Sequence, residues 1–277
     1  MTVEANKRSL TLEIENLSVA FGQGAKSAVV VDNISLKIGK GEIVGLIGES
    51  GSGKTVASLA VLGMLPRGAK VIQGSIKLTD DLLLERTDDY RRSIRGDRIA
   101  LIPQDALRSL NPTLKVGYQV GEPLNLHRSA SWAFARSKAI ELLRSVNLSD
   151  PERRSEEYPH QFSGGMQQRA MIAMGLSTEP ELLIADEPTT ALDVTVQAQV
   201  LDLLRAVRDQ HDTSILFITH DLGVVANLCD RVYVMYSGAI VEEGPVQQIF
   251  SNPSHPYTRG LLEATPRIQD RKSTRLN

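Results

Sequence analysis

The stretch "GESGSGKT", residues 48–55, decides the fold of this chain of 277 residues. It matches the pattern G-x-x-x-x-G-K-[ST] of a phosphate-binding loop, whose glycines let the backbone wrap closely around an anion. The apolar run "EIVGLI" (42–47) predicts a strand that enters the loop, and "TVASLAVLGML" (55–65) predicts a helix that leaves it. A chance glycine-rich turn would lack this order of strand, loop and helix, so we predict a nucleotide-binding core.

Each position of this loop has a predicted task. Backbone N–H groups point at phosphate oxygens, Lys54 places a positive charge between the outer phosphates, and the hydroxyl of Thr55 ligates Mg²⁺. The residues predicted to hold the triphosphate are Gly48, Glu49, Ser50, Gly51, Ser52, Gly53, Lys54 and Thr55.

Further apolar runs predict a parallel sheet around the loop. They are "EIVGLIG" (42–48), "RIALIPQ" (98–104), "ELLIADE" (181–187) and "SILFITH" (214–220), and helical stretches separate most of them. Strands that are apolar on both faces and alternate with helices indicate a parallel α/β sheet.

Other segments have different patterns. Apolar residues alternate with polar ones over 10–21 and 34–38, which predicts antiparallel strands with one solvated face. Helical spacing without any buried-strand pattern predicts a helical insertion over about 105–170. The segment "RVYVMYSGAIVEEG" (231–244) predicts a hairpin that turns at Ser237 and Gly238. The proline-bearing segment that follows has no strong core signal.

Polar side chains end the buried runs, where parallel strands meet at one sheet edge. Asp186 is predicted to hold Mg²⁺ through water, and Glu187 to orient or deprotonate the attacking water. Two acids after a strand are commonplace and usually have only a structural role. Downstream of a phosphate loop, a role in metal binding and catalysis is favoured, because a nucleotide site needs such a pair. Gln104 is predicted to reach the metal or the water, and His220 the γ-phosphate, with packing as the alternative for the histidine.

A second glycine-containing stretch, "FSGGMQQRA" (162–170), also predicts an anion site. A serine and two glycines precede a helix-like run, so free N–H groups and the positive end of a helix dipole are exposed there. One triphosphate has one set of β- and γ-phosphate oxygens, which a single phosphate loop can bind. A second anion site in the same chain would therefore serve best by binding a second nucleotide.

Composition limits the remaining classes. The net charge of −2 gives no reason to expect a nucleic-acid partner. The start of the chain lacks the apolar block of a signal peptide, and no run is long enough to span a bilayer. The single cysteine, Cys229, fits a reducing cytoplasm and is expected to be a small buried hydrophobe.

Taken in order, these motifs resemble the nucleotide-binding subunit of ATP-binding cassette (ABC) transporters over about residues 10–265. The ordered series is "GESGSGKT", Gln104, "FSGGMQQR", "LLIADE" (182–187), "ALD" (191–193) and His220. The resemblance implies an α/β P-loop NTPase with a RecA-like parallel-sheet core, an N-terminal antiparallel β subdomain and an inserted helical subdomain. It also implies one domain over 1–265, the helical subdomain over about 105–170, and a short tail, 266–277, which is either a natural end or a truncated one.

In that family two domains pack head to tail, and the resemblance implies that Ser163, Gly164 and Gly165 cover the ATP of a partner domain. Asp193 would line the same seam, and Phe21 would stack on adenine, with a core position as its alternative. The family's signature usually reads L-S-G-G-Q, whereas Met166 replaces its glutamine here. Gln167 is then the candidate to supply the missing hydrogen bond.

Finer phrases, "YPHQFSGGMQQR" (158–169) and "HPYTRGLL" (255–262), are similar to the dipeptide, oligopeptide and nickel importer branch. The resemblance implies an ATPase that energises import of peptides or nickel, with ATP and Mg²⁺ as cofactors. Its partners would be an identical or sister ATPase domain, two transmembrane permeases contacted by the helical insertion and, indirectly, an extracytoplasmic solute-binding protein. It would lie peripherally on the cytoplasmic face of the plasma or inner membrane, without a nucleic-acid partner.

Three alternatives remain open. One is the cassette ATPase of a system for another solute, and a second is a soluble cassette ATPase without a transport role. The second would carry a long coiled-coil insertion, zinc cysteines or two cassettes, and none of these patterns is present. A P-loop kinase or GTPase is the third, and it leaves "FSGGMQQR" and "ALD" unexplained.

Overall fold

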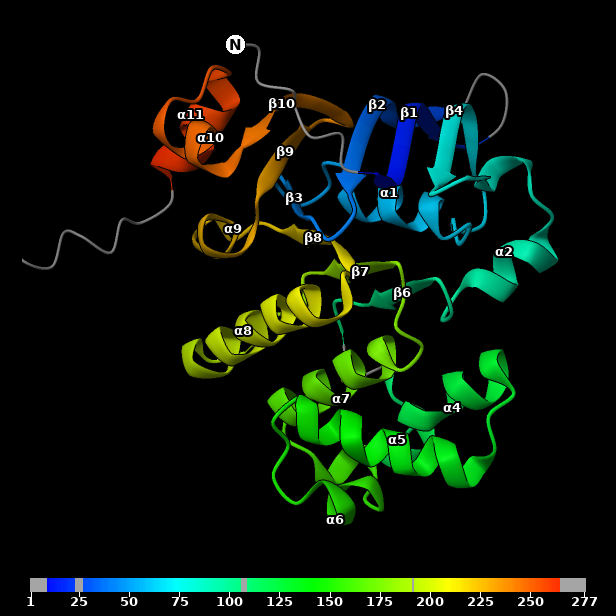
Figure 1. Ribbon diagram of the computed structural model, residues 1–277. Coiled ribbons are helices and arrows are strands. Elements are labelled where there is room, and N and C mark those ends of the chain that lie inside the picture. The colour runs from blue at the N-terminus through cyan, green and yellow to red at the C-terminus, as the bar shows by residue number, and fades with distance from the viewer. Residues whose placement is uncertain (1–8, 23–26, 106–108, 191, 265–277) are drawn as a thin grey trace, which may run out of the picture.

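The computed structural model describes residues 9–22, 27–105, 109–190 and 192–264. Two lobes are visible in Figure 1, an upper one built around β-sheets and a lower one built of helices. The tail expected over 266–277 lies outside the described residues. None of the helices within the described residues combines the length and the apolar character that crossing a bilayer requires.

A six-stranded sheet has the strand order β10-β9-β3-β8-β7-β6. Its first five strands in chain order run parallel to one another: β3 (Ile43–Ile47), β6 (Ile99–Ile102), β7 (Leu182–Asp186), β8 (Ser214–Thr219) and β9 (Arg231–Tyr236). The last strand, β10 (Ala239–Pro245), pairs antiparallel with β9. Ser237 and Gly238 both have positive φ in the intervening turn, which confirms the predicted hairpin.

Burial on both faces explains why these strands read as continuous apolar runs. Every residue of β3, β7 and β8 is buried. In β7, Leu183 and Ala185 belong to one hydrophobic cluster, while Leu182 and Ile184 belong to another on the opposite face. Each such leucine or isoleucine side chain contributes roughly 1.5–3 kcal/mol to stability on burial. The predicted parallel core is therefore confirmed.

An antiparallel sheet with the strand order β2-β1-β4-β5 covers one of these clusters. Its strands are β1 (Leu10–Phe21), β2 (Ala28–Gly39), β4 (Ala69–Leu78) and β5 (Asp81–Leu82). Ile14 and Leu17 of β1 are three residues apart, so a regular strand would place them on opposite faces. A register shift at Asn16, whose φ is +49°, turns both side chains into the core.

Helices fill the connections of the upper lobe. They are α1 (Lys54–Val61), η2 (Leu83–Glu85), α2 (Asp88–Ile94), α8 (Val194–His211) and α9 (Leu222–Leu228). The apolar face of α8 packs into the core, since Val200, Leu203, Leu204 and Val207 are buried and Val196 packs beside them.

The segment after the hairpin differs from the sequence expectation. It forms α10 (Val246–Ser251) and α11 (Pro256–Glu263), and Val246 and Ile249 are buried in a third hydrophobic cluster against β9. Each helix has only one or two turns, so neither is long enough to produce a clear apolar stripe in the sequence.

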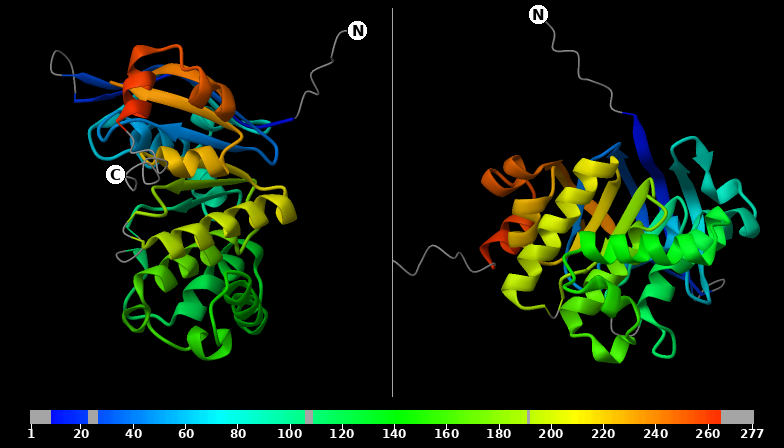
Figure 2. Two further views of the ribbon diagram at one scale, coloured as in Figure 1. Left: turned by 90° about the vertical axis from the view of Figure 1, so that its left-hand side faces the viewer. Right: turned by 60° about the horizontal axis from the view of Figure 1, so that its bottom comes forward.

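The lower lobe lies between β6 and β7 in the chain and contains no strand within the described residues. Its helices are α4 (Val116–Arg128), α5 (Trp132–Ser145), α6 (Pro151–Ser155), η3 (Pro159–Gln161) and α7 (Gly164–Leu176). The largest hydrophobic cluster runs from these helices into β6, β7 and α8 without a break. The left view of Figure 2 shows the helical lobe directly below the sheets, and the shared hydrophobic cluster joins the two.

Arg98 ties the two sheets together at the edge opposite the phosphate loop. Its guanidinium donates to Glu181 (Nε–Oε1 2.5 Å), which precedes β7, and to Asp81 of β5. The hydroxyl of Tyr90 also donates to Asp81, at 2.7 Å. Hydrogen bonds from Arg98 and Tyr90 hold the pKa of Asp81 at about 2, below its usual 3.8.

We expect Arg98→Met to lower the free energy of unfolding by about 2 kcal/mol, because charged hydrogen bonds are lost while the side-chain stem is kept. The depressed pKa means that Asp81 stabilises the fold above about pH 4, and that this contribution disappears as the pH falls toward 2. Urea unfolding at pH 7 and at low pH measures both effects. Equal stability of variant and wild type at pH 7, or an unchanged loss of stability between pH 4 and pH 2, would contradict this role.

Candidate nucleotide-binding site

Four predicted functional segments lie at the carboxyl ends of adjacent parallel strands. The phosphate loop follows β3, His220 follows β8, Asp186 ends β7 and Gln104 follows β6. Because these strands are neighbours in one sheet, residues more than a hundred positions apart reach a single edge. Open α/β sheets bind ligands at this edge.

The phosphate loop is supported from behind by the β9–β10 hairpin. The N–H of Gly238 donates to the carbonyl of Ser52 at 3.0 Å. A Cβ on Gly48, which has a φ of +153°, would lie only 2.1 Å from the carbonyl oxygen of Met235. Glycine at position 48 is therefore required by this close approach, whereas Gly51 has open space around it and is favoured by its φ of +82°.

Lys54 is buried at the start of α1. Its Nζ donates to the carbonyls of Gly48 and Glu49, both at 2.8 Å. Burial lowers the pKa of this amine, although the carboxylates of Glu187 and Asp186 oppose that shift. The ammonium group thus lies inside the curve of the loop. No carboxylate among the described residues bonds to it directly.

Asp186 and Thr55 supply oxygen atoms beside the loop. Asp186 is only 6% exposed, and burial raises its pKa while the hydrogen bond from the Thr55 hydroxyl opposes the rise. No group of three or more His, Cys, Asp or Glu side chains suited to a metal occurs in the described ranges. A hydroxyl and one carboxylate nevertheless fit Mg²⁺, which proteins commonly hold through one or two such oxygens together with substrate phosphates and water.

Glu187 is the centre of a polar cluster. Its Oε1 lies 3.0 Å from Nδ1 of His220, and its Oε2 accepts from Thr190 Oγ1 at 2.9 Å and from Gln104 Nε2 at 3.3 Å. Burial would raise the pKa of Glu187, but the hydrogen bonds from His220 and Thr190 outweigh it and lower the pKa below its usual value. The side chain is therefore a carboxylate at neutral pH.

Sequence reasoning missed Thr190. It lies three residues after Glu187, in a turn closed by the hydrogen bond from Thr190 N to the carbonyl of Glu187 at 3.2 Å. A hydroxyl three residues from an acid is too common in sequences to be a signal by itself.

The second glycine stretch begins helix α7. Ser163 is the N-cap residue, and its Oγ accepts from the N–H of Met166 at 3.3 Å. Ser163 and Gly164 are exposed, and a Cβ on Gly164 would meet nothing within 4 Å. Along the described ranges, no hydrogen bond joins Ser163, Gly164 or Gly165 to the phosphate loop. The two glycine segments therefore do not form one cradle within the chain.

The start of α7 contacts the start of α8. A Cβ on Gly165 would lie 2.7 Å from Cγ1 of Val196, so glycine permits a close packing of the two helix ends. Asp193 caps α8 by accepting from the N–H of Val196 at 2.9 Å. Val194, next to it, is 81% exposed although it is apolar. Ser163, Gly164, Gly165 and Asp193 thus belong to one surface of the molecule.

Gln167 does not replace the glutamine that Met166 displaced, and that expectation is wrong. Gln167 is buried, and its Nε2 donates to the carbonyls of Pro159 at 2.8 Å and of Phe162 at 3.3 Å. The amide therefore holds the turn before α7, facing inward. The side chain of Met166 is partly buried against the largest hydrophobic cluster.

Phe21 lies at the end of β1, opposite Ala28 of β2 and Ala69 of β4. It is half-buried and does not belong to any of the three hydrophobic clusters formed by the described residues. Its ring is thus available for a contact outside the core.

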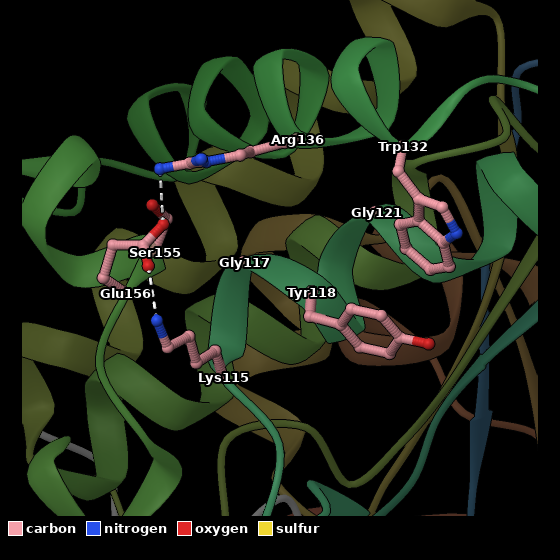
Figure 3. A pocket seen from close by; sticks show the side chains of 8 residues that line it. All are labelled: Lys115, Gly117, Tyr118, Gly121, Trp132, Arg136, Ser155 and Glu156. Carbon is pink, nitrogen blue, oxygen red and sulfur yellow. Dashed lines mark hydrogen bonds and ion pairs between the residues drawn. The ribbon is translucent and has the colours of Figure 1, made fainter.

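The helical lobe has a separate cavity of about 340 Å³, shown in Figure 3. The rings of Tyr118 and Trp132 stack on one side, with centroids 4.4 Å apart. Lys115 and Arg136 both pair with Glu156 on the other side, each at 2.7 Å. This cavity is apolar at one end and charged at the other, and it is unlike a phosphate cradle.

Comparison with known proteins gives a consistent result. Residues 31–190 match the ABC transporter family, and residues 241–277 match the C-terminal region of oligopeptide/dipeptide transporters. A probable peptide ABC transporter ATP-binding protein of Sinorhizobium fredii is 46% identical over 278 residues, covering 100% of this chain and 83% of that protein. An oligopeptide transport ATP-binding protein of Bacillus subtilis is 49% identical over 261 residues, covering 94% and 80%.

Solved structures agree in fold. A dimeric ATP-binding cassette in a post-hydrolysis state, bound to ADP and phosphate, superposes with a TM-score of 0.75 at 28% identity, covering 85% of this chain and 98% of that one. A second dimeric structure of the same bacterial ABC transporter cassette gives a TM-score of 0.75 at 27% identity, with the same coverage. These similarities confirm the predicted fold class, including its parallel core, antiparallel subdomain and helical insertion.

Proposed function

Because this chain belongs to the ABC transporter family, we propose that it is the subunit whose ATP hydrolysis drives import of peptides. The chain is an ATPase of that family and binds ATP. Relatives that are 46% and 49% identical bear names of peptide and oligopeptide transport proteins, and the match at residues 241–277 is to the same group. These names favour peptides over nickel as the solute.

The observation that carries the hydrolytic role is the polar cluster around Glu187. A carboxylate held by Gln104, Thr190 and His220 lies at the sheet edge where the phosphate loop opens. Glu187 would accept a proton from the attacking water, His220 would contact the γ-phosphate, and Gln104 would orient the water.

The loop residues would bind the triphosphate. Lys54 would exchange its two carbonyl contacts for β- and γ-phosphate oxygens. The loop N–H groups other than that of Glu49, which donates to the hydroxyl of Tyr257, would bind the remaining oxygens. Thr55 and Asp186 would hold Mg²⁺, with Gln104 approaching from β6. The ion would neutralise charge that develops on the phosphate oxygens. Phe21 would stack on the adenine ring.

The family's cassettes act as dimers within transporters, as the two dimeric structures of one solved relative illustrate. We propose that the surface formed by Ser163, Gly164, Gly165 and Asp193 covers ATP held by the partner domain. The exposure of Ser163, Gly164 and Val194 supports this proposal, because helix-end N–H groups and an apolar side chain face solvent in the single chain.

The family places the chain at a membrane within a transporter. We propose the cytoplasmic face, with two permease subunits that contact the helical lobe and a solute-binding protein outside. The cavity with Tyr118 and Trp132 supports a permease contact, because Trp132 is 43% exposed and Phe134 nearby in the sequence is 57% exposed. Exposed aromatic residues beside charged ones are typical of binding surfaces.

Deletion of the gene should abolish uptake of a labelled peptide and leave nickel uptake unchanged, because both cassettes of a transporter are needed for closure. Complementation with wild type should restore peptide uptake, and complementation with Glu187→Gln should not. A panel from dipeptides to hexapeptides would define the preferred length. Loss of nickel uptake with normal uptake of every peptide would assign the chain to nickel instead.

A further inference from the structure

Tyr257, in α11, contacts the phosphate loop although 208 positions separate it from Glu49. Its hydroxyl accepts a hydrogen bond from the backbone N–H of Glu49 at 3.0 Å. Its ring lies against that of Tyr236, at the end of β9, with centroids 4.3 Å apart and a tilt of 39°. Figure 1 shows α11 beside the β9–β10 hairpin, on the outer side of the sheet.

Glu49 is held through both of its backbone polar groups. Its N–H donates to Tyr257, and its carbonyl accepts from Nζ of Lys54 at 2.8 Å. The amine that is proposed to bind phosphate therefore shares a backbone residue with the tyrosine. A change in the position of Glu49 would move the carbonyl on which Lys54 depends for its orientation.

Helix α11 is fixed to the same hairpin that supports the loop. Glu242 of β10 accepts from the N–H groups of Ser254 at 2.6 Å and of His255 at 3.1 Å. The ring of His255 caps the helix by accepting from the N–H of Tyr257 at 3.2 Å, and Thr258 is fully buried. The phenol is thus held in place by its own helix, independently of the loop.

The hairpin and α11 therefore support the loop at two points. Gly238 binds the carbonyl of Ser52, as described above, and Tyr257 binds the N–H of Glu49. Glu49 N–H would otherwise need a water molecule or a phosphate as its acceptor.

We propose that Tyr257 is a positioning residue for ATP binding, whose hydroxyl preorganises the first turn of the phosphate loop. This inference rests on the proposal that the loop binds ATP. It gives the segment "HPYTRGLL" a task in the nucleotide site rather than in contact with a transported solute. Preorganisation lowers the cost of ordering a binding loop, so its loss weakens affinity without touching the hydrolytic cluster.

Tyr257→Phe keeps the ring and removes the hydroxyl. Titration of the full-length chain with a fluorescent ATP analogue should show a Kd about three- to tenfold higher than that of wild type. The turnover rate at saturating ATP should stay unchanged. Amide hydrogen exchange of the peptide containing Glu49 should become faster in the absence of nucleotide, because its acceptor has gone.

Tyr236→Phe is the matched control. It also removes one phenol hydroxyl from the same ring pair, and that hydroxyl makes no hydrogen bond to any described residue. The control should retain wild-type affinity and exchange. Wild-type affinity in Tyr257→Phe, or the same change in both variants, would overturn the positioning role, as would slower turnover at saturating ATP.

The Lys54→Ala variant distinguishes failure of this inference from failure of the proposal that the phosphate loop binds ATP. If Lys54→Ala loses ATP while Tyr257→Phe binds normally, the loop is the nucleotide site and the tyrosine has no part in it. If Lys54→Ala binds ATP normally, the proposed site itself is wrong, and the inference fails with it.

Discussion

Glu187→Gln chains are expected to bind ATP and to release phosphate about 100- to 10,000-fold more slowly than wild type, since an amide cannot accept the proton of the attacking water. The substitution conserves shape, and the amide can still bond to Thr190 and His220. With hydrolysis blocked, ATP-bound dimers should accumulate. A phosphate-release assay and size-exclusion chromatography with ATP measure the two effects.

Thr190→Val is a useful comparison for this variant. It removes the hydroxyl that donates to Glu187 Oε2 while it leaves the carboxylate in place. We expect a loss of less than about tenfold, because one neutral hydrogen bond contributes about 1 kcal/mol. Normal phosphate release by Glu187→Gln would remove Glu187 from the reaction, whatever Thr190→Val does.

Lys54→Ala is expected to bind ATP about 10- to 100-fold more weakly, because the charged contacts to two phosphates are lost. Ser163→Arg should bind ATP but fail to cover the nucleotide of its partner. Each homodimer should therefore be inactive, for different reasons. Nucleotide titration and an ATPase assay on the separate variants establish these starting points.

Mixing the two variants tests whether the site is shared. A mixed dimer combines the intact phosphate loop of the Ser163→Arg chain with the intact glycine segment of the Lys54→Ala chain. Half of randomly paired dimers are mixed and each has one of its two sites, so about a quarter of wild-type activity should return. Mass spectrometry must first confirm that mixed dimers form. If mixed dimers form and one intact site suffices for hydrolysis, complete absence of recovered activity means that the glycine segment does not act across the interface.

Much of the fold was accessible from sequence because its signals are local. The glycines and Lys54 occur within eight residues, between a strand and a helix that each have a clear pattern. The strand ends that carry Gln104, Asp186 and His220 could be assigned to one edge because parallel strands present the same end to it. Their meeting around Glu187 follows from topology, whereas the choice of hydrogen-bond partners does not.

The parts that sequence missed depend on contacts between distant or ambiguous positions. A glutamine such as Gln167 can face solvent or the interior with equal ease, and only the turn at Pro159 decides which carbonyls it meets. Tyr257 belongs to a helix of eight residues, and the hydrogen bond to Glu49 exists because α11 folds back along the hairpin. Neither the contacts of Gln167 nor that of Tyr257 could be predicted from a periodic pattern in the sequence.

The packing of Gly165 on Val196 makes the beginnings of α7 and α8 a single mechanical unit. The side chain of Val196 packs directly on the backbone of Gly165, so we expect a displacement of one helix start to move the other. If both helix ends bind the nucleotide of a neighbouring domain, they lose contact with it at the same time. Release of that neighbour would then be an abrupt, switch-like event rather than a gradual loosening.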